Sequence, residues 1–434
     1  MRNHGLFGEK LSHSMSPEIQ KYIYSKIGYN AEYSLIEFEK SCIKDKVGLL
    51  KEGVLDGVNV TIPYKKEVME YLDELDKNAE NIGAVNTIVC NNGKLTGYNT
   101  DYYGIEKTLE PYGSPDGGDY LVLGYGGASR PLIQYLADNK AKTVFVASRN
   151  PEKYSDFKKN KTEIVFRGYD EIENITGRMI INTTPVGMYP DTDKSPVGRE
   201  IFKNYSCAVD FIYNPHMTKF LKDASESGIM TQNGLKMLVY QAIRAVELWS
   251  STDINENIQQ DIYLHFRREN VESESIYLVG LPGSGKTTFG KIMAEKLGYV
   301  HIDLDEYIVE MNKMSIPEIF EKFGESGFRE RETEALREVS SLKNTVVSTG
   351  GGAVTTKKNR EILKKADMVI FIDRPCEDIL QDVNLKDRPL LKNTPKRIFE
   401  LRDERINFYN EVSHYTVKND STMEKMLSDI FSCL

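Results

Sequence analysis

The stretch "YLVGLPGSGKTTFG", Tyr277 to Gly290, decides the fold of the second half of this chain. Within it, Gly280–Thr287 matches the pattern G-x-x-x-x-G-K-[ST] in full, between an apolar run and a helical pattern. Glycines let consecutive backbone N–H groups turn toward phosphate oxygens, and the N-terminus of the following helix adds positive potential. The alternative, a glycine turn that arises by chance, leaves the strand before it and the helix after it unexplained.

The motif predicts ATP as a ligand, together with Mg²⁺. We expect Lys286 to reach the β- and γ-phosphates and the Thr287 hydroxyl to coordinate the metal. The other nucleotide-binding residues that the motif predicts are Gly283, Ser284, Gly285 and Thr288.

Length and composition restrict what kind of protein this is. A chain of 434 residues exceeds the size at which one hydrophobic core keeps growing, so two or three domains are expected. The sequence has no run of about 18 uncharged apolar residues and no apolar core near its start, so we expect a cytoplasmic location without a membrane anchor. A net charge of -9 argues against general nucleic-acid binding. The five cysteines are far apart and form no Cys-x-x-Cys pair, which argues against disulfides and a zinc site.

Apolar runs and turn residues predict an α/β fold throughout, in two tandem units. Residues 1–105 alternate short strands with helical patterns, and residues 106–250 continue as strand, glycine turn, helix and strand. Residues 251–274 are polar without a sustained apolar face, so we assign them to a linker, although the run "IYLHF" inside them could pack. Residues 275–434 return to strands alternating with helices, in the layout of a parallel sheet.

Candidate acceptor residues follow the phosphate-binding motif. Asp303 and Asp305 end the next predicted strand two residues apart, so both carboxylates should point to one face, toward the ligand edge of the sheet. Each arginine in this region fits a solvated surface charge if it is considered alone. Together they favour a small anionic acceptor, because a guanidinium group matches the geometry of a carboxylate. The arginines and the glycines near them are Arg329, Arg388, Arg405, Gly350, Gly351 and Gly352.

Nearly all of residues 275–434 resembles shikimate kinases. The shared features are the phosphate-binding loop, the Asp-x-Asp strand end, "GESGFRERE", the triple glycine, the "RPLL" lid and an arginine four residues before a tyrosine. One departure is that "LQDVNLKD" lacks the arginine often found ahead of "RPLL". The resemblance implies that Asp305 holds the ring hydroxyls and accepts the attacking hydroxyl's proton, and that Asp303 belongs to the Mg²⁺ shell. It also assigns the shikimate carboxylate to Arg329 and Arg405, the ring to Gly351 and Gly352, and the transferring phosphate to Arg388.

The stretch "VLGYGGASR" predicts dinucleotide binding in the first half of the chain. It follows an apolar strand and precedes a helix, although Ser129 takes the third glycine position of G-x-G-x-x-[GA]. The next predicted strand is followed by Ser148 and Arg149, where an NAD enzyme places an acidic residue on the ribose 2′-hydroxyl. A hydroxyl and a guanidinium suit a 2′-phosphate instead, so we predict NADP over NAD. The predicted turn residues are Gly124, Gly126, Gly127 and Ala128.

Lys65, Asn86 and Asp101 lie in polar turns beside apolar strands. An isolated Lys–Asp combination is usually a surface ion pair, but this placement favours a cleft. Reduction of a carbonyl needs a hydride and a proton, and a lysine beside a carboxylate can supply the proton and orient the oxygen.

Almost all of residues 1–250 resembles shikimate dehydrogenases. The family's markers occur in order: "HSMSP", "NVTIPYK", "IGAVNT", "NTDYYG", "GYGGAS", "NTTPVGM", "VDFIYNP" and "NGLKMLVYQA". The resemblance implies that Lys65 is the catalytic acid/base, paired with Asp101, and that Arg149 holds the 2′-phosphate. Tyr213 and Gly234 would lie near the substrate and the nicotinamide. The implied substrate contacts are Ser14 and Ser16 to the carboxylate, and Thr61, Asn86, Asp101 and Gln241 to ring hydroxyls.

The two resemblances together imply a bifunctional enzyme of the shikimate pathway, with small molecules as its only predicted partners. It would reduce 3-dehydroshikimate to shikimate with NADPH and then phosphorylate shikimate to shikimate 3-phosphate with ATP. The implied domains are a substrate domain (1–105), a Rossmann-like NADP domain whose last helix returns to it (106–250), the linker (251–274) and the kinase (275–434).

Two alternatives remain. An NAD-linked quinate/shikimate dehydrogenase fused to a kinase is disfavoured by Arg149. A non-catalytic ligand-sensing fusion would be expected to lack Lys65, Asp101, Lys286 or Asp305, all of which are present.

Overall fold

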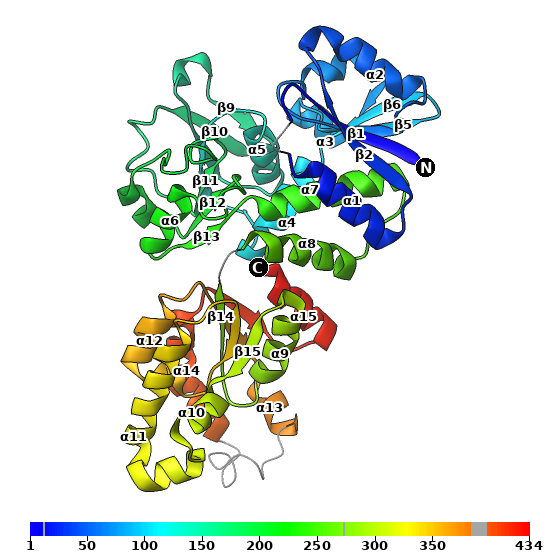
Figure 1. Cartoon of the computed structure of the whole chain (residues 1–434). Helices are drawn as coiled ribbons and strands as arrows, with labels where there is room; N and C mark the ends of the chain where they lie inside the picture. The colour runs from blue at the N-terminus through cyan, green and yellow to red at the C-terminus, as the bar shows by residue number, and fades with distance from the viewer. Residues whose placement is uncertain (12–13, 272–273, 383–396) are drawn as a thin grey trace. The chain divides into compact units, whose positions relative to one another are not determined.

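A computed structural model describes residues 1–11, 14–271, 274–382 and 397–434 (Figure 1). The chain divides into two compact units, Met1–Arg267 and Arg268–Leu434. Both are built from sheets rich in parallel pairs with helices between the strands, which confirms the predicted α/β class. None of the helices in these ranges is long and apolar enough to cross a membrane.

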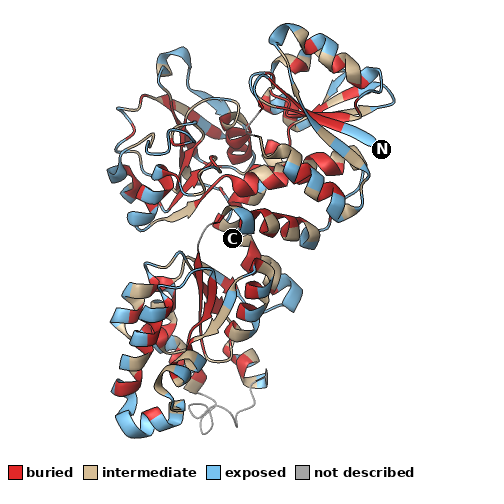
Figure 2. Cartoon of the chain, viewed as in Figure 1, coloured by how far each residue is buried: buried red, intermediate tan, exposed pale blue. Residues whose placement is uncertain are grey.

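The first sheet of unit 1 has the strand order β2-β1-β3-β5-β6-β4. Strands β1, β2 and β3 run parallel, whereas β5 pairs antiparallel with β3 and β6. Every residue of β3 is buried, and the strands in the middle of this sheet are coloured as buried in Figure 2. The elements are β1 (Arg2–Gly8), α1 (Ser16–Ile27), β2 (Ala31–Glu37), η1 (Lys40–Cys42), α2 (Ile43–Lys51), β3 (Gly57–Val60), η2 (Glu67–Tyr71), β4 (Glu74–Leu75), α3 (Lys77–Ile82), β5 (Thr87–Asn91), β6 (Lys94–Tyr98), α4 (Asp101–Leu109) and η3 (Glu110–Tyr112).

The second sheet of unit 1 has the order β13-β12-β11-β7-β8-β10-β9, and only β9 runs antiparallel to its neighbour. This is the doubly wound arrangement, in which the strand order reverses on either side of β7. Ligands of such sheets bind beyond the carboxyl ends of the strands at that reversal. The elements are β7 (Asp119–Leu123), α5 (Ser129–Asp138), β8 (Thr143–Ala147), η4 (Pro151–Lys153), β9 (Phe157–Lys159), β10 (Thr162–Arg167), β11 (Met179–Asn182), η5 (Arg199–Asn204), β12 (Cys207–Asp210), α6 (Lys219–Glu226) and β13 (Met230–Gln232).

Helix α7 (Leu235–Ser250) connects the second sheet to the first. It packs on α4, where Gly104 lies so close to the Met237 carbonyl that a side chain would have no room. At its other end the Trp249 indole donates a hydrogen bond to the Ile88 carbonyl of β5 at 3.1 Å. The helix therefore fixes the first residues of α4 relative to both sheets.

Helix α8 (Glu256–Asn270) occupies most of residues 251–274, the segment predicted to be a linker. Tyr263 and Phe266 are at most 2% exposed, and their rings lie against Tyr240 and Tyr22 of unit 1. The rings of Tyr22 and His265 stack at 3.8 Å, and the Tyr103 hydroxyl donates to Gln259 at 2.8 Å. Residues 251–274 are mostly polar, but their one short apolar run, "IYLHF", is enough to bury one side of a helix.

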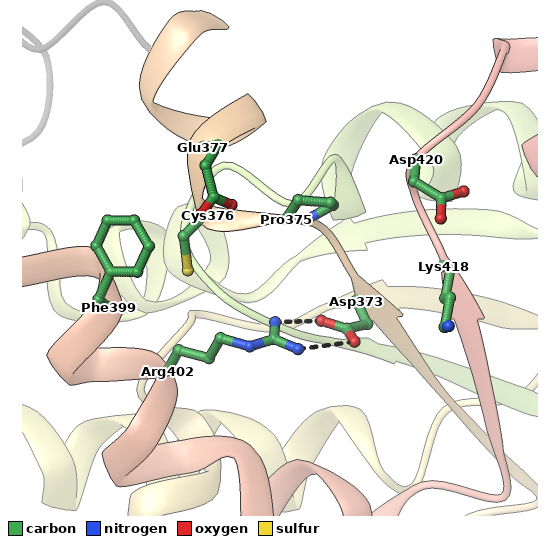
Figure 3. Close-up of a pocket in the computed structure, with 8 residues that line it drawn as sticks. All are labelled: Asp373, Pro375, Cys376, Glu377, Phe399, Arg402, Lys418 and Asp420. Carbon is green, nitrogen blue, oxygen red and sulfur yellow. Dashed lines mark hydrogen bonds and ion pairs between the residues drawn. The ribbon is translucent and has the colours of Figure 1, made fainter.

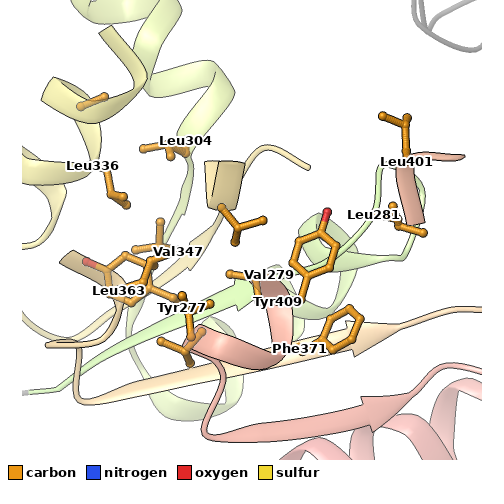
Figure 4. Packing of buried hydrophobic residues seen from close by; sticks show 14 of the residues in the cluster. Tyr277, Val279, Leu281, Leu304, Leu336, Val347, Leu363, Phe371, Leu401 and Tyr409 are labelled. Atoms are coloured by element: carbon orange, nitrogen blue, oxygen red, sulfur yellow. The ribbon is translucent and has the colours of Figure 1, made fainter. Parts of the chain in front are cut away.

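Unit 2 contains one parallel sheet in the order β15-β16-β14-β17-β18. All five residues of β14 are buried at its centre, and a core of aliphatic and aromatic side chains fills one face (Figure 4). In that core the rings of Phe371 and Tyr409 stack at 4.9 Å. The elements are β14 (Ser275–Val279), α9 (Lys286–Leu297), β15 (Val300–Asp303), α10 (Leu304–Asn312), α11 (Ile316–Val339), β16 (Thr345–Ser348), η6 (Ala353–Thr355), α12 (Lys357–Leu363), β17 (Met368–Asp373), α13 (Cys376–Asp382), α14 (Arg397–Val412), β18 (Tyr415–Lys418) and α15 (Met423–Ser432).

Candidate active sites

Lys65, Asn86 and Asp101 form one hydrogen-bonded cluster in unit 1. The Lys65 ammonium donates to Asp101 Oδ2 at 2.7 Å, and Asn86 Nδ2 donates to Asp101 Oδ1 at 2.8 Å. The side chains of Lys65 and Asp101 are 18% and 9% exposed, so this is not a solvated surface pair. Asp101 is the first residue of α4, where a carboxylate suits the positive end of the helix.

Asn86 holds the cluster in one orientation. Its side-chain oxygen accepts from the Thr100 backbone N–H at 2.7 Å and from the Thr87 hydroxyl at 3.1 Å. Its amide nitrogen is thereby directed at Asp101, and the carboxylate is left with Oδ2 facing Lys65.

The other predicted substrate residues lie on separate elements. Ser14 accepts from the Ser16 N–H at 3.2 Å at the start of α1, and Thr61 follows β3. Gln241 lies on α7 and donates to the Leu238 carbonyl at 2.8 Å, and Tyr213 follows β12. Within the described residues, none of these side chains is hydrogen-bonded to Lys65 or Asp101.

A cavity of about 600 Å³ opens at the carboxyl ends of β7, β8 and β11, where the strand order reverses. Of the predicted cofactor residues, Gly124, Gly126, Ser148 and Arg149 line it. Gly127 and Ala128 continue the turn into α5, whereas Gly234 lies apart, just before α7, and donates its N–H to the Ile212 carbonyl at 3.1 Å.

Ser129 explains how the turn tolerates the loss of its third glycine. Its hydroxyl oxygen accepts from the Gly126 N–H at 2.8 Å, and its O–H donates to the Gly126 carbonyl at 3.0 Å. The side chain is fully buried and fastens the turn to the first residue of α5. A small hydroxyl residue therefore keeps the tight strand-to-helix connection.

Sequence reasoning missed several residues that line the same cavity. A tyrosine or threonine in a loop belongs to no recognisable sequence pattern, so these residues could not be selected individually, although four of them lie within the family marker "NTTPVGM". These residues are Tyr125, Tyr154, Tyr169, Thr183, Thr184, Pro185 and Val186.

The phosphate-binding loop of unit 2 joins β14 to α9, as its motif predicts. Gly283 and Gly285 have φ angles of 85° and 99°, which residues with side chains rarely adopt. The Lys286 ammonium donates to the carbonyls of Gly280 and Leu281 at 2.9 and 2.8 Å. Lys286 is thus held over the loop, beside the N-terminus of α9.

Arg374 and Asn419, which were not predicted from the sequence, donate hydrogen bonds to carbonyl groups of this loop. Arg374 donates to the Gly283 carbonyl at 3.2 Å, and the Asn419 amide donates to the Ser284 carbonyl at 2.9 Å. They directly follow β17 and β18, so the sheet positions the loop through its own strand ends.

A cavity of about 390 Å³ lies beside these strand ends (Figure 3). The Arg402 guanidinium of α14 faces the Asp373 carboxylate there, with Nη2 and Oδ2 at 3.0 Å. Lys418 and Asp420 line the cavity from the side of β18, and Phe399 lies on α14 with Arg402. None of these residues was predicted.

Thr287 and Asp303 are in contact, with the Thr287 hydroxyl donating to Asp303 Oδ2 at 2.9 Å. Oxygen donors of this kind suit Mg²⁺, which usually takes few protein ligands and shares its shell with water and phosphate. The described residues contain no cluster of three or more His, Cys, Asp or Glu side chains that could hold a metal ion.

Asp305 differs in one respect from the prediction, because β15 ends at Asp303 and Asp305 lies in the first turn of α10. Asp303 caps that helix and accepts from the Asp305 N–H at 3.1 Å. The two carboxylates therefore have different neighbours: Asp303 faces Thr287, and Asp305 lies against Gly350, where a Cβ would be 2.7 Å from Asp305 Oδ1.

Arg329 and Arg405 reach the same triple glycine from two helices. A Cβ on Gly352 would lie 2.5 Å from Arg329 Nη2, and Arg405 Nη1 donates to the Gly351 carbonyl at 3.0 Å. Arg405 is only 7% exposed, and its Nε has no hydrogen-bond partner among the described residues. A buried guanidinium group with an N–H donor that makes no hydrogen bond favours the binding of an anion beside it.

Glu332, the last residue of "GESGFRERE", holds Arg329 in place. Its Oε2 accepts from Arg329 Nη1 at 2.8 Å, and its side chain is 1% exposed. Burial raises the pKa of Glu332, and the nearby Arg329 acts in the opposite direction. The motif contained this residue, but its role was not apparent from the sequence. Arg388, predicted to bind the transferring phosphate, lies outside the described residues.

The folds and sites define two classes of enzyme on one chain. Unit 1 is a dinucleotide-dependent oxidoreductase with a lysine–aspartate cluster, and unit 2 is a phosphotransferase with a phosphate-binding loop and two arginines beside a triple glycine.

Comparison with known proteins supports both classes. The family "Shikimate dehydrogenase substrate binding domain" matches residues 6–88, and the family "Shikimate kinase" matches residues 282–434. The shikimate dehydrogenase (NADP(+)) of Clostridium perfringens is 44% identical over 266 residues, which cover 61% of this chain and 97% of that protein.

Two solved structures are similar to the same part of the chain. Shikimate dehydrogenase 1 from Peptoclostridium difficile is 39% identical with a TM-score of 0.56, covering 62% of this chain and all of that one. A chorismate mutase/shikimate 5-dehydrogenase fusion protein from Clostridium acetobutylicum is 43% identical with a TM-score of 0.58, covering 62% and 98%. The chain belongs to the shikimate dehydrogenase family through unit 1, and its second unit is a shikimate kinase domain.

Proposed function

We propose that this chain catalyses two consecutive reactions. Unit 1 reduces 3-dehydroshikimate to shikimate with NADPH, and unit 2 phosphorylates the shikimate 3-hydroxyl with ATP. The observation that supports this best is the poorly exposed Lys65–Asp101 pair, fixed by Asn86, on the same chain as an ATP-binding loop and two acceptor-site arginines.

In the reductase, NADPH supplies the hydride, and the chain supplies the proton. Lys65 donates the proton to the carbonyl oxygen, because its ammonium is the acidic group of the cluster. Asp101 orients that ammonium and accepts a hydrogen bond from the substrate, while Asn86 keeps the carboxylate in place. Ser14 and Ser16 bind the carboxylate, and Thr61, Gln241 and Tyr213 complete the site.

We infer that the reductase uses NADP rather than NAD. Ser148 and Arg149 line the cofactor cavity directly after β8, where the ribose 2′-position is expected. A guanidinium binds a phosphate through paired hydrogen bonds, whereas a free 2′-hydroxyl offers it no charge.

In the kinase, ATP would supply the phosphoryl group, and Mg²⁺ would neutralise negative charge on the phosphates. The Lys286 ammonium would exchange its hydrogen bonds to the loop carbonyls for hydrogen bonds to the phosphates. Thr287 and Asp303 would contribute to the metal shell. Asp305 accepts the proton of the attacking hydroxyl. Arg329, Arg405, Gly351 and Gly352 bind the acceptor, and Arg388 binds the transferring phosphate.

One assay tests both halves. The intact protein is incubated with 3-dehydroshikimate, ATP, Mg²⁺ and either NADPH or NADH, and oxidised cofactor and shikimate 3-phosphate are followed together. We expect both products, with a higher initial rate for NADPH. Higher rates with NADH, or with quinate as the reductant of NAD⁺, would support the quinate-type alternative. Binding of shikimate and ATP without turnover would support a ligand sensor.

Two substitutions separate the activities. Lys65→Ala should abolish the NADPH-dependent reduction and leave the ATP-dependent phosphorylation of added shikimate intact, whereas Lys286→Ala should do the reverse. Loss of both activities in either variant would contradict two independent sites.

A further inference from the structure

A buried carboxylate–amide pair joins the ends of two neighbouring strands in unit 1. Asn182 and Asp210 are the last residues of β11 and β12, and they lie directly opposite each other in the parallel register. Both are fully buried, and Asn182 Nδ2 donates to Asp210 Oδ1 at 3.0 Å. Neither residue belongs to the predicted site.

Asn182 holds the loop that lines the cofactor cavity. Its Oδ1 accepts from the Thr184 N–H at 3.0 Å and from the Thr184 hydroxyl at 2.7 Å. Its Nδ2 also lies 3.4 Å from the Val186 carbonyl. Residues 183–186 therefore take their shape from the side chain of Asn182.

Asp210 holds the neighbouring loop. Its Oδ1 accepts from the Ile212 N–H at 3.0 Å, and its Oδ2 accepts from the Thr218 hydroxyl at 2.7 Å. Thr218 caps α6, so the carboxylate fixes both ends of the segment between β12 and that helix. The Ile212 carbonyl in turn accepts from the Gly234 N–H at 3.1 Å.

We propose that Asp210 and Asn182 are positioning residues for hydride transfer, which act by holding residues 183–186 and 211–218 against the nicotinamide half of the cofactor. The proposal rests on the proposed reductase function, because it places the nicotinamide on the β11–β12 side and the 2′-phosphate at Arg149 on the β8 side. The pair touches neither the cofactor cavity nor the lysine cluster directly.

The Asp210 carboxylate costs more than simple packing would require. A buried carboxylate is costly unless several donors satisfy it, and an apolar pair of the same size would avoid that cost. Burial raises the pKa of Asp210 to about 7, and the hydrogen bonds from Thr218, Ile212 and Asn182 only partly offset this. What the carboxylate provides is several directed acceptors at one point between two loops.

The test compares Asp210→Ala with Asp210→Asn in the full-length chain. Asparagine keeps an acceptor for Asn182 and Ile212 and can donate to Thr218, so the reductase kcat should stay within about threefold of wild type. Alanine removes every acceptor, so kcat at saturating NADPH should fall at least tenfold. Affinity for 2′,5′-ADP, which probes only the adenosine half, should change by less than about twofold in both variants.

Asp223→Ala is the matched control, because Asp223 is a largely buried carboxylate of α6 that pairs with Lys219 and not with the two loops. Its kcat should remain close to wild type. Phosphorylation of added shikimate by unit 2 gives the concentration of chain in each sample, and the fluorescence of Trp249, the single tryptophan, shows whether unit 1 is folded. If Asp210→Ala does not fold, Thr218→Val removes one hydroxyl donor at constant volume and should give a smaller loss of kcat with the same unchanged 2′,5′-ADP affinity.

The outcomes separate this inference from the proposed function. A wild-type chain without NADPH-dependent reduction would overturn the proposed function itself. With an active wild type, the positioning role is overturned if Asp210→Ala or Thr218→Val loses no more kcat than Asp223→Ala. It is also overturned if affinity for 2′,5′-ADP falls in parallel with kcat, because the pair would then support the whole cavity.

Discussion

Among single residues, Glu332 restrains Arg329 in the proposed acceptor site. It is buried and hydrogen-bonded to Arg329, whereas the other acidic partner, Glu325, is 73% exposed and 3.5 Å away. We predict that Glu332→Gln raises KM for shikimate about tenfold and leaves KM for ATP unchanged, because a buried charged pair restrains a side chain far more than a surface pair. Glu325→Gln is the control and should alter KM by less than about twofold. Equal effects of the two substitutions, measured by steady-state phosphorylation, would contradict the prediction.

The stability of unit 1 should depend on pH through Asp210. The pKa of Asp210 is raised to about 7 in the folded protein, from an ordinary value near 3.8, because of burial. The folded state therefore holds this proton up to higher pH, and its contribution to stability is lost as pH rises from about 4 to about 7. The predicted loss is up to about 4 kcal/mol in the free energy of unfolding.

Asp210→Asn should remove this pH dependence, so its stability relative to wild type should improve from pH 5 to pH 8. Trp249 is the single tryptophan of the chain and lies in unit 1, so its fluorescence during denaturant unfolding reports this unit alone. A stability difference between the two proteins that does not change with pH would show that Asp210 keeps an ordinary pKa.

At the scale of elements, the kink in α11 positions Arg329 and Glu332. Gly324 has φ 68° and ψ -175°, a conformation open almost only to glycine, and no atom would meet an added Cβ within 4 Å. Gly324→Ala should therefore destabilise the kinase through the backbone alone, by about 1–3 kcal/mol. We expect inactivation at lower temperature and a higher KM for shikimate. The control Ser326→Ala, two residues away and exposed, should change neither; an unchanged Gly324→Ala enzyme would show that the helix can straighten.

Much at this scale could be predicted from the sequence, because local signals were strong. The phosphate-binding loop and the GxG turn both follow from glycines at fixed positions. Glu332, Arg374 and the Asn182–Asp210 pair could not be predicted, since their roles depend on which strand ends become neighbours. Helix α8 was missed for a related reason: a polar helix is recognised only when the surface that buries its few apolar residues is known.

At the scale of the whole molecule, we propose that the dehydrogenase ends with α8 and not at residue 250. The rings of Tyr263 and Phe266 lie against Tyr240 and Tyr22 of unit 1. Ile262, Tyr263, Leu264 and Phe266 are at most 2% exposed, and each buried side chain of this size contributes about 1.5–3 kcal/mol. Their sum is comparable with the total unfolding free energy of a typical domain. The segment between α8 and β14, residues 271–274, is then the boundary between the two enzymes.

This boundary predicts how the chain can be divided. A fragment of residues 1–270 should keep the reductase kcat within about twofold, and residues 271–434 should keep the kinase activity. A fragment of residues 1–250 should unfold at much lower denaturant concentration or aggregate, because the surface that α8 covers is exposed. Both reductase fragments contain Trp249, so the same fluorescence signal reports their unfolding. Equal stability of the two fragments would show that residues 251–270 act only as a linker. An inactive 1–270 fragment would show that the reductase depends on unit 2.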